Sequence, residues 1–189
     1  MLVIKALSPG IPLQREIDAR TLCGDTVSVR IGRSGIRPFT LAYQPAPSAR
    51  WRSFPLSEEA RMVLAGLLPD SALFGAFQDD EFVGQAMAVL SSSGWCHLVD
   101  LRVDTSHRLI GIGRSLLEAC QRFAGKNGMA GLHLTVSDLN PVMCQFCEHC
   151  GFSLEGIDRL AYAMLPEERM KPLLQRACAL HFYRQNERG

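Results

Sequence analysis

A strand-like segment, a glycine-containing turn and a helix-like segment follow one another in the middle of the chain. The strand-like residues run from His97 to Val103, and the helix-like residues run from Ile112 to Ala124. Between them lies the sequence His107-Arg108-Leu109-Ile110-Gly111-Ile112-Gly113-Arg114-Ser115. The N–H groups in the first turn of a helix have no partner within the helix, and the helix dipole favours negative charge there. This arrangement therefore predicts a binding site for a phosphate group.

Two glycines and one arginine suit the turn to this role. Gly111 and Gly113 have no Cβ, so the main chain can bend sharply and approach a ligand closely. Arg108 adds a fixed positive charge at the mouth of the turn. A nucleotide-binding turn of the form Gly-x-Gly-x-x-Gly would need a third glycine where this chain has Leu116. The other interpretation of this stretch is an ordinary strand–helix turn with a surface arginine.

Length and composition limit what the rest of the chain can be. The chain has 189 residues, 47% of them hydrophobic and 21% charged, which is typical of one globular domain that buries a core. A net charge of +1 argues against a general nucleic-acid-binding protein. No apolar stretch approaches the ~18 residues of a transmembrane helix, and the N-terminal residues do not resemble a secretion signal. The seven cysteines, an odd number, then indicate a reduced, cytoplasmic protein with free thiols and no membrane partner.

Three of these cysteines, Cys144, Cys147 and Cys150, form the pattern Cys-x2-Cys-x2-Cys. An iron–sulfur run of this type needs a fourth cysteine after three more residues, followed by proline, and this chain has Leu154-Glu155 there. The three thiols also fall in an expected helix, where successive steps of three residues drift around the axis. We therefore expect no metal site and assign two of the three cysteines to small apolar packing.

The remaining segments predict a mixture of strands and helices. Strands are expected at Leu2–Leu7, Val27–Ile31, Phe39–Tyr43, Ala72–Phe77, Phe82–Leu90, Cys96–Val103, Gly131–Val136, Phe152–Met164 and Ala177–Tyr183. Helices are expected at Pro12–Leu22, Ser57–Leu68, Ile112–Ala124, Asn140–Cys150 and Pro166–Gln175. Asn140 is a good helix cap before a proline, and Gly151 suits the left-handed residue that ends a helix.

Two of these segments, at the observed separation, resemble the core of the GNAT family of N-acetyltransferases. The acyl-CoA-binding signature of that family is Gln/Arg-x-x-Gly-x-Gly/Ala, which Arg108, Gly111 and Gly113 satisfy. Its second segment, an Asn-capped helix that ends at Gly-Phe, is matched by residues 140–152. The signature resembles the streptothricin acetyltransferase branch most when it is combined with three other segments: Phe74-Gly75-Ala76-Phe77, Val83-Gly84 and Cys150-Gly151-Phe152-x-x-x-Gly156-Ile157-Asp158.

The resemblance covers residues 73–162 and implies an α/β (α+β) fold, the GNAT fold. In this fold a central mixed, mostly antiparallel sheet splays at the acyl-CoA site and has helices on its flanks. We expect residues 1–189 to form a single GNAT-like domain. The sequence leaves open whether this domain is a monomer or a homodimer.

The resemblance also implies how acetyl-CoA, the acyl donor, would bind. The backbone of Leu101, Arg102 and Val103 would pair with the pantetheine arm like an added strand, and Asn140 would contact the pantetheine. The pyrophosphate would lie on the turn formed by Arg108, Leu109, Ile110, Gly111, Ile112, Gly113, Arg114 and Ser115. The implied reaction is direct attack of a primary amine of a small molecule on the thioester. The alternative is a GNAT-fold protein that binds acyl-CoA as a sensor or structural subunit and catalyses little.

The catalytic groups remain open at this level. His97 and Asp100 are alternative bases for the attacking ammonium, and they are expected on opposite faces of one strand, because side chains alternate along it. A structural role is the competing interpretation for each. Cys147 stands where many relatives have a tyrosine that protonates the departing CoA. The thiol is therefore either a replacement acid or a packing residue.

Overall fold

The computed structural model describes residues 1–10, 16–32, 39–162 and 177–186. Contacts within the chain cluster into two compact units. Unit 1 comprises Met1–Arg20, Ser53–His133 and Gln185–Gly189, and unit 2 comprises Thr21–Arg52 and Leu134–Arg184. The single domain expected over residues 1–189 stays a prediction.

An antiparallel sheet forms the centre of unit 1. Its strands lie in the order β1 (Leu2–Leu7), β4 (Ser71–Gln78), β5 (Glu81–Leu90) and β6 (Cys96–Val103). β6 also pairs in parallel with the start of β7 (Gly131–Ser137), where Cys96 faces Leu132 and His97 faces His133. The sheet is therefore mixed and mostly antiparallel, as the resemblance implied.

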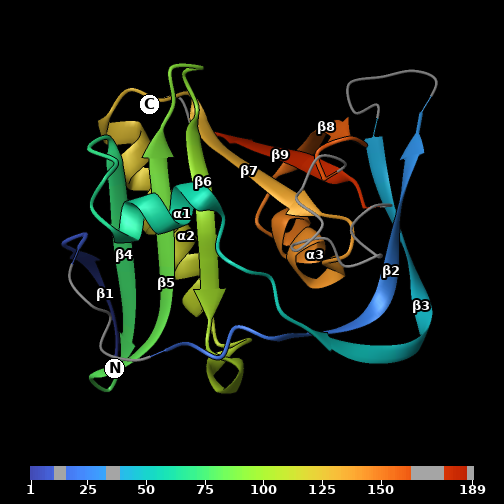
Figure 1. Ribbon diagram of the computed structural model, residues 1–189, viewed down its shortest axis with the longest axis horizontal. Helices are drawn as coiled ribbons and strands as arrows, with labels where there is room; N and C mark the ends of the chain where they lie inside the picture. Colours follow the sequence, from blue (N-terminus) through green and yellow to red (C-terminus); the bar gives the residue numbers. More distant parts are fainter. Residues whose placement is uncertain (11–15, 33–38, 163–176, 187–189) are drawn as a thin grey trace. The chain divides into compact units, whose positions relative to one another are not determined.

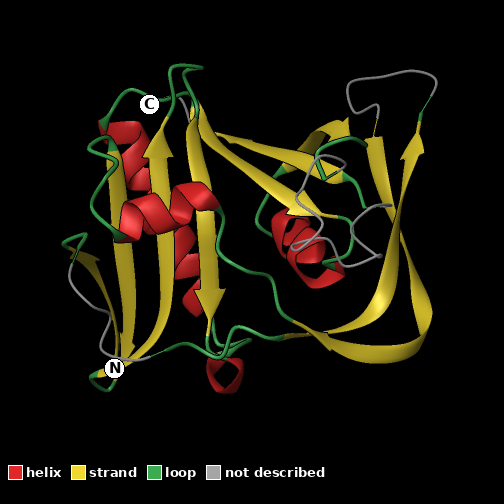
Figure 2. Ribbon diagram, in the orientation of Figure 1, coloured by secondary structure: helices red, strands yellow, loops and turns green. Residues whose placement is uncertain are grey.

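Helices cover the two faces of this sheet, as Figure 1 and Figure 2 show. α1 (Glu58–Leu64) begins at Ser57, whose side chain accepts a hydrogen bond from a first-turn N–H, and it packs its buried Val63 against Met87 of β5. α2 (Ile112–Lys126) lies on the other face, where Phe74 of β4 meets Phe123 with ring centroids 6.4 Å apart. The predicted helix after the glycine turn is thus confirmed, with its apolar side against the sheet.

Unit 2 combines a long two-stranded ribbon, the remaining sheet strands and a helix. The ribbon pairs β2 (Thr21–Ile31) with β3 (Phe39–Arg52), and β7 continues in hydrogen-bond order to β9 (Ala179–Gln185) and β8 (Ser153–Asp158). α3 (Pro141–His149) begins at Asn140, whose side chain accepts a hydrogen bond from the N–H of Met143. Gly151 follows its end with φ +79°. The predicted asparagine cap and glycine stop are both confirmed.

Several predicted segments differ from the structure. The helix predicted at Pro12–Leu22 is wrong in its described part, because residues 16–20 are irregular and Leu22 belongs to β2. At Thr21 and Leu22, pairing with β3 overrides the weak local preference for helix. The strand predicted at Phe152–Met164 ends at Asp158, whose carboxylate accepts a hydrogen bond from the N–H of Leu160 and so forms a turn. The helix predicted at Pro166–Gln175 lies outside the described residues.

Candidate functional site

The turn between β6 and α2 has an unusual backbone. A short 3-10 turn at Thr105–His107 (η1) follows β6, and then Leu109 has φ +64° and Gly111 has φ +91°. Gly111 is the N-cap of α2, and within the described chain no side chain caps the first-turn N–H groups there. The Leu109 and Ile110 side chains are 104% and 62% exposed. The start of a 15-residue helix therefore presents its backbone N–H groups, with no acidic residue in its first turn.

Glycine is required at position 111 because of the backbone conformation there and not because neighbouring protein atoms leave no room for a Cβ. A Cβ built on Gly111 would have no heavy atom within 4 Å. Its φ of +91°, however, is strained for any side chain with a Cβ. Leu109 adopts a left-handed conformation without being glycine, at a typical cost of about 1–3 kcal/mol, and such residues cluster at functional sites. The open space over Gly111 is what close approach of a ligand requires.

Arg108 stands between the end of β6 and the glycine turn. Its Nε donates a hydrogen bond to the carbonyl of Val103 at 3.0 Å. Burial lowers the pKa of its guanidinium, and the charges of Asp18 and Asp104 oppose that shift. The side chain is therefore anchored on the end of the strand, as a residue that positions a charge would be. The remaining predicted turn residues, Ile112, Gly113, Arg114 and Ser115, form the first turn of α2.

A β-bulge at Val99 changes the face to which two candidate bases point. Asp100 lies opposite Met87 of β5, and His97 lies opposite Val89, two residues further along. Residues two apart in β5 share a face, so His97 and Asp100 also share one, although they are three residues apart. The prediction that they point to opposite faces is wrong, because it assumed a regular strand.

Asp100 is held in a buried polar cluster. Gln85 donates to it from Nε2 at 2.7 Å, and the Arg102 guanidinium donates from Nε at 2.9 Å and from Nη2 at 2.6 Å. The Asp100 and Arg102 side chains are only 7% and 19% exposed. A buried carboxylate must be paired in this way to be stable. The cluster favours the structural interpretation of Asp100.

His97 has a different environment from Asp100. Its ring meets that of His133 edge to face, with centroids 4.7 Å apart, at one of the two described positions where β6 pairs with β7. Both side chains are partly exposed. Along its other edge β6 pairs with β5. In that pairing Leu101, Arg102 and Val103 lie opposite Ala86, Gln85 and Gly84.

Asn140 and Cys147 belong to unit 2, whereas the turn and β6 belong to unit 1. The Asn140 Oδ1 is occupied in capping α3, at 3.1 Å from the Met143 N–H. Cys147 is completely buried in α3 beside two other buried cysteines, Cys144 and Cys150. Burial raises the pKa of the Cys147 thiol well above its ordinary value. A neutral thiol of this kind is a weak acid, which favours packing over proton donation.

Sequence reasoning assigned no role to Tyr43, which the fold brings to α3. The Tyr43 hydroxyl donates to Glu148 Oε2 at 2.6 Å, across 105 residues of sequence. Burial and this carboxylate raise the pKa of Tyr43. Only the pairing of β3 with β2 and their packing against α3 place it there, so no local signal in the sequence could have indicated it.

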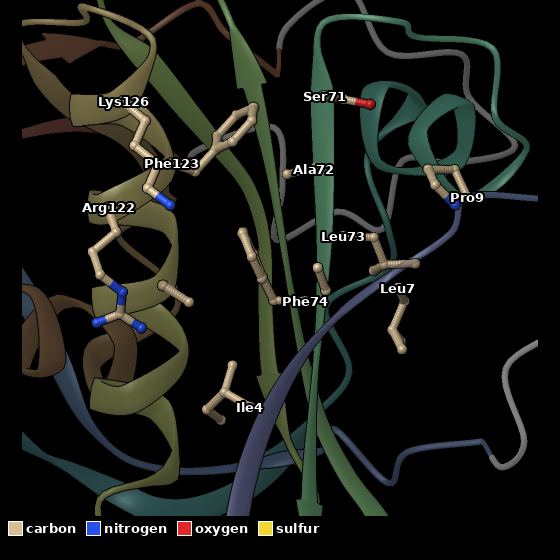
Figure 3. Close-up of a pocket in the computed structure, with 12 residues that line it drawn as sticks. Ile4, Leu7, Pro9, Ser71, Ala72, Leu73, Phe74, Arg122, Phe123 and Lys126 are labelled. Atoms are coloured by element: carbon tan, nitrogen blue, oxygen red, sulfur yellow. The ribbon is translucent and has the colours of Figure 1, made fainter.

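A cavity of about 430 Å³ lies elsewhere in unit 1, between β1, β4 and α2 (Figure 3). Phe74 and Phe123 lie on its apolar side, and Arg122 and Lys126 stand on the helix beside it. No residue of the predicted site is among the described residues that line it. Within the same described ranges, no group of three His, Cys, Asp or Glu side chains is arranged to hold a metal ion. There is also no described helix long and apolar enough to cross a membrane.

Two curated proteins match about half of this chain. Over 101 residues the chain is 34% identical to streptothricin acetyltransferase of Escherichia coli, which covers 52% of this chain and 56% of that protein. It is 25% identical over 95 residues to streptothricin acetyltransferase A of Bacillus subtilis, covering 50% and 55%. The match therefore spans a little over half the length of these curated relatives.

Two solved structures share the fold over nearly the whole chain. A protein of Bacillus anthracis assigned as a streptothricin acetyltransferase, in complex with acetyl coenzyme A, has a TM-score of 0.80 at 20% identity and covers 98% of this chain and 99% of its own. Nourseothricin acetyltransferase has a TM-score of 0.74 at 22% identity, with the same coverage. The model of the acetyltransferase (GNAT) family matches residues 37–152, which include both segments that carried the resemblance. The chain belongs to the GNAT family of acetyltransferases.

Proposed function

We propose that this protein is an acetyl-CoA-dependent N-acetyltransferase that acts on a primary amine of a small molecule. The observation that carries the proposal is the turn at the start of α2, where Gly111 at φ +91° leaves open space and no described side chain caps the helix. Membership of the GNAT family and similarity to two streptothricin acetyltransferases support the same reaction. Streptothricin is therefore the first acceptor to test.

Two parts of unit 1 hold the acyl donor in this proposal. The pyrophosphate lies on the N–H groups of residues 109–115, with Arg108 contributing its charge. The pantetheine arm runs along the backbone of Leu101, Arg102 and Val103 in β6. The contact expected from Asn140, which belongs to unit 2 and whose Oδ1 caps α3, stays a prediction. No metal takes part.

The reaction then needs little covalent chemistry from the protein. The amine nitrogen attacks the thioester carbon, a C–N bond forms, the C–S bond breaks, and the CoA sulfur leaves with the electron pair. A backbone N–H of β6 near Leu101 stabilises the oxyanion that develops. Holding the two reactants together supplies up to ~7–11 kcal/mol of the barrier in well-aligned systems. The ammonium loses one proton to the base before the attack. The nitrogen loses a second proton as the amide forms, and this proton is available to the departing thiolate.

His97 is the base in this proposal, and Asp100 is a positioning residue. Gln85 and Arg102 already bond to both carboxylate oxygens of Asp100 and hold them in place. His97 is partly exposed, and in the described chain its ring contacts the ring of His133. The amine must also reach the face of β6 that carries His97.

A second candidate function is acyl-CoA binding with little catalysis. The buried, neutral Cys147 thiol favours this alternative, because it leaves the departing thiolate without an obvious acid from α3. A CoA-release assay over streptothricin, polyamines and peptide N-termini tests both functions. Turnover on any of these amines supports the enzyme. Tight acetyl-CoA binding with no turnover on the whole panel supports the binding protein.

We expect Arg108→Ala to weaken acetyl-CoA binding by about 1.5–3 kcal/mol, the usual contribution of a hydrogen bond to a charged group. Calorimetry at low and high salt measures the loss. It should shrink at high salt, because salt screens the attraction between the guanidinium and a phosphate. Arg122→Ala, in the same unit but on the cavity side of α2, is the matched control and should bind normally. A loss that does not change with salt would assign Arg108 to packing.

We expect Cys147→Ala to lower kcat by less than about tenfold, below the ~10²–10⁴-fold that general acids contribute. The reason is that burial keeps this thiol neutral and reluctant to release its proton. Cys147→Ser, which keeps the size and changes the acidity, should behave like Cys147→Ala in a steady-state assay. A hundredfold loss in both variants with unchanged acetyl-CoA affinity would make the thiol an essential acid.

A further inference from the structure

We propose that Asp104 and Asp18 are positioning residues for the acyl donor, which act by fixing η1 and so placing Arg108 and the glycine turn. The proposal rests on the proposed function, because it concerns how the acetyl-CoA site is built. Asp104 directly follows β6, and Asp18 comes from the segment that precedes β2. All of these residues belong to unit 1.

Asp104 is a buried carboxylate, 3% exposed, at the end of β6. Its own N–H donates to the carbonyl of Val83 in β5 at 2.8 Å. Its Oδ1 accepts from the N–H and the hydroxyl of Ser106 at 3.1 and 2.6 Å, and its Oδ2 accepts from the N–H of Asp18 at 3.3 Å. A carboxylate is stable in such a buried place only when donors surround it. Asp104 therefore connects β5, η1 and the segment around Asp18 through its hydrogen bonds.

Asp18 also forms hydrogen bonds to η1, through Thr105. Its carbonyl accepts from the N–H of Thr105 at 3.0 Å, and its Oδ2 accepts from the Thr105 hydroxyl at 3.3 Å. Arg20 binds the carboxylate with two groups, Nε at 2.9 Å and Nη2 at 2.8 Å. These hydrogen bonds from Arg20 lower the pKa of Asp18 well below its usual range, so it stays ionised at neutral pH.

Arg108 is the residue through which Asp18 and Asp104 would affect ligand binding. It follows η1 directly and is fixed to β6 by the bond from its Nε to the Val103 carbonyl. Asp18 and Asp104 also act on its guanidinium through their charges. Two carboxylates beside a phosphate site would repel the phosphate if they faced it. The hydrogen bonds that both carboxylates accept from Ser106, Asp18 and Thr105 instead hold the turn, and their charges favour the positive charge of Arg108.

The test compares two donors, acetyl-CoA and acetyl-pantetheine, which lacks the pyrophosphate. Asp104→Asn and Asp18→Ala should raise KM for acetyl-CoA by about tenfold, the size of losing one charged hydrogen bond, with kcat changed by less than about threefold. With acetyl-pantetheine the kcat/KM of both variants should stay within about twofold of wild type, because the turn has no pyrophosphate to hold. General damage to the fold would lower kcat/KM for both donors alike.

Thr105→Val and Asp158→Asn complete the design. Thr105→Val removes only the hydrogen bond from the Thr105 hydroxyl to Asp18. It can therefore be measured even if Asp104→Asn does not fold. We expect it to raise KM for acetyl-CoA and to leave KM for acetyl-pantetheine unchanged. Asp158→Asn alters another carboxylate that caps a turn, by the bond from the Leu160 N–H, and should change neither donor's kinetics. Unchanged KM for acetyl-CoA in the folded variants, or equal losses with both donors, would overturn the positioning role. If the wild-type protein uses neither donor, the proposed function itself fails, and this role fails with it.

Discussion

Gly111→Val should lower acetyl-CoA affinity by about 10–100-fold, because the pyrophosphate loses close contact with the N–H groups of the turn and each charged hydrogen bond contributes about 1.5–3 kcal/mol. A Cβ at Gly111 meets no protein atom within 4 Å, so it points into the space that the ligand is expected to fill. A β-branched residue also resists the φ of +91° found there. Calorimetry on the folded variant measures the loss.

The effect of the ligand contact can be separated from that of backbone strain. Gly128, at the other end of α2, has φ +71° and also has no atom within 4 Å of an added Cβ. Gly128→Val therefore introduces similar backbone strain at a position away from the expected ligand. It should bind acetyl-CoA normally at a reduced melting temperature. Gly111→Asn, which tolerates the left-handed conformation, should bind better than Gly111→Val. Wild-type affinity in Gly111→Val would refute the assignment of the turn.

His97→Ala should lower kcat by about a hundredfold or more, within the ~10²–10⁴-fold range of a general base, with little change in KM for acetyl-CoA. The reason is that Asp100, its rival on the same face of β6, is held by Gln85 and Arg102. Steady-state kinetics with a saturating amine measures the change. His149→Ala, at the end of α3, is a control for the loss of one imidazole and should keep kcat.

The comparison with Asp100→Asn decides between the two bases. That variant keeps the size of the side chain and a carbonyl oxygen for Arg102, so it should lose some stability and less than about tenfold in kcat. The opposite result, near-normal kcat in His97→Ala and a hundredfold loss in Asp100→Asn, would make Asp100 the base. Melting temperatures of both variants show whether a loss comes from unfolding.

The sequence predicted those features of the fold that depend on interactions between neighbouring residues. The Asn140 cap, the Gly151 stop and the helix after Gly111 were readable because capping and left-handed glycine act over a few residues. The glycine turn could be found for the same reason, since its signature lies within nine consecutive residues. The family could be recognised from two such segments at the right separation.

What the tertiary structure alone decided depends on contacts between distant residues. The bulge at Val99 arises from the register of β6 on β5, and it places His97 and Asp100 on one face where simple alternation put them on two. Thr21 and Leu22, the last residues of the predicted helix, belong to β2 because they pair with Arg52 and Trp51 of β3. The hold of Asp18 on Thr105, across 87 residues, exists only in the folded chain. Sequence patterns therefore determined most of the elements and the glycine turn, whereas pairing and packing over long separations determined which side chains lie together.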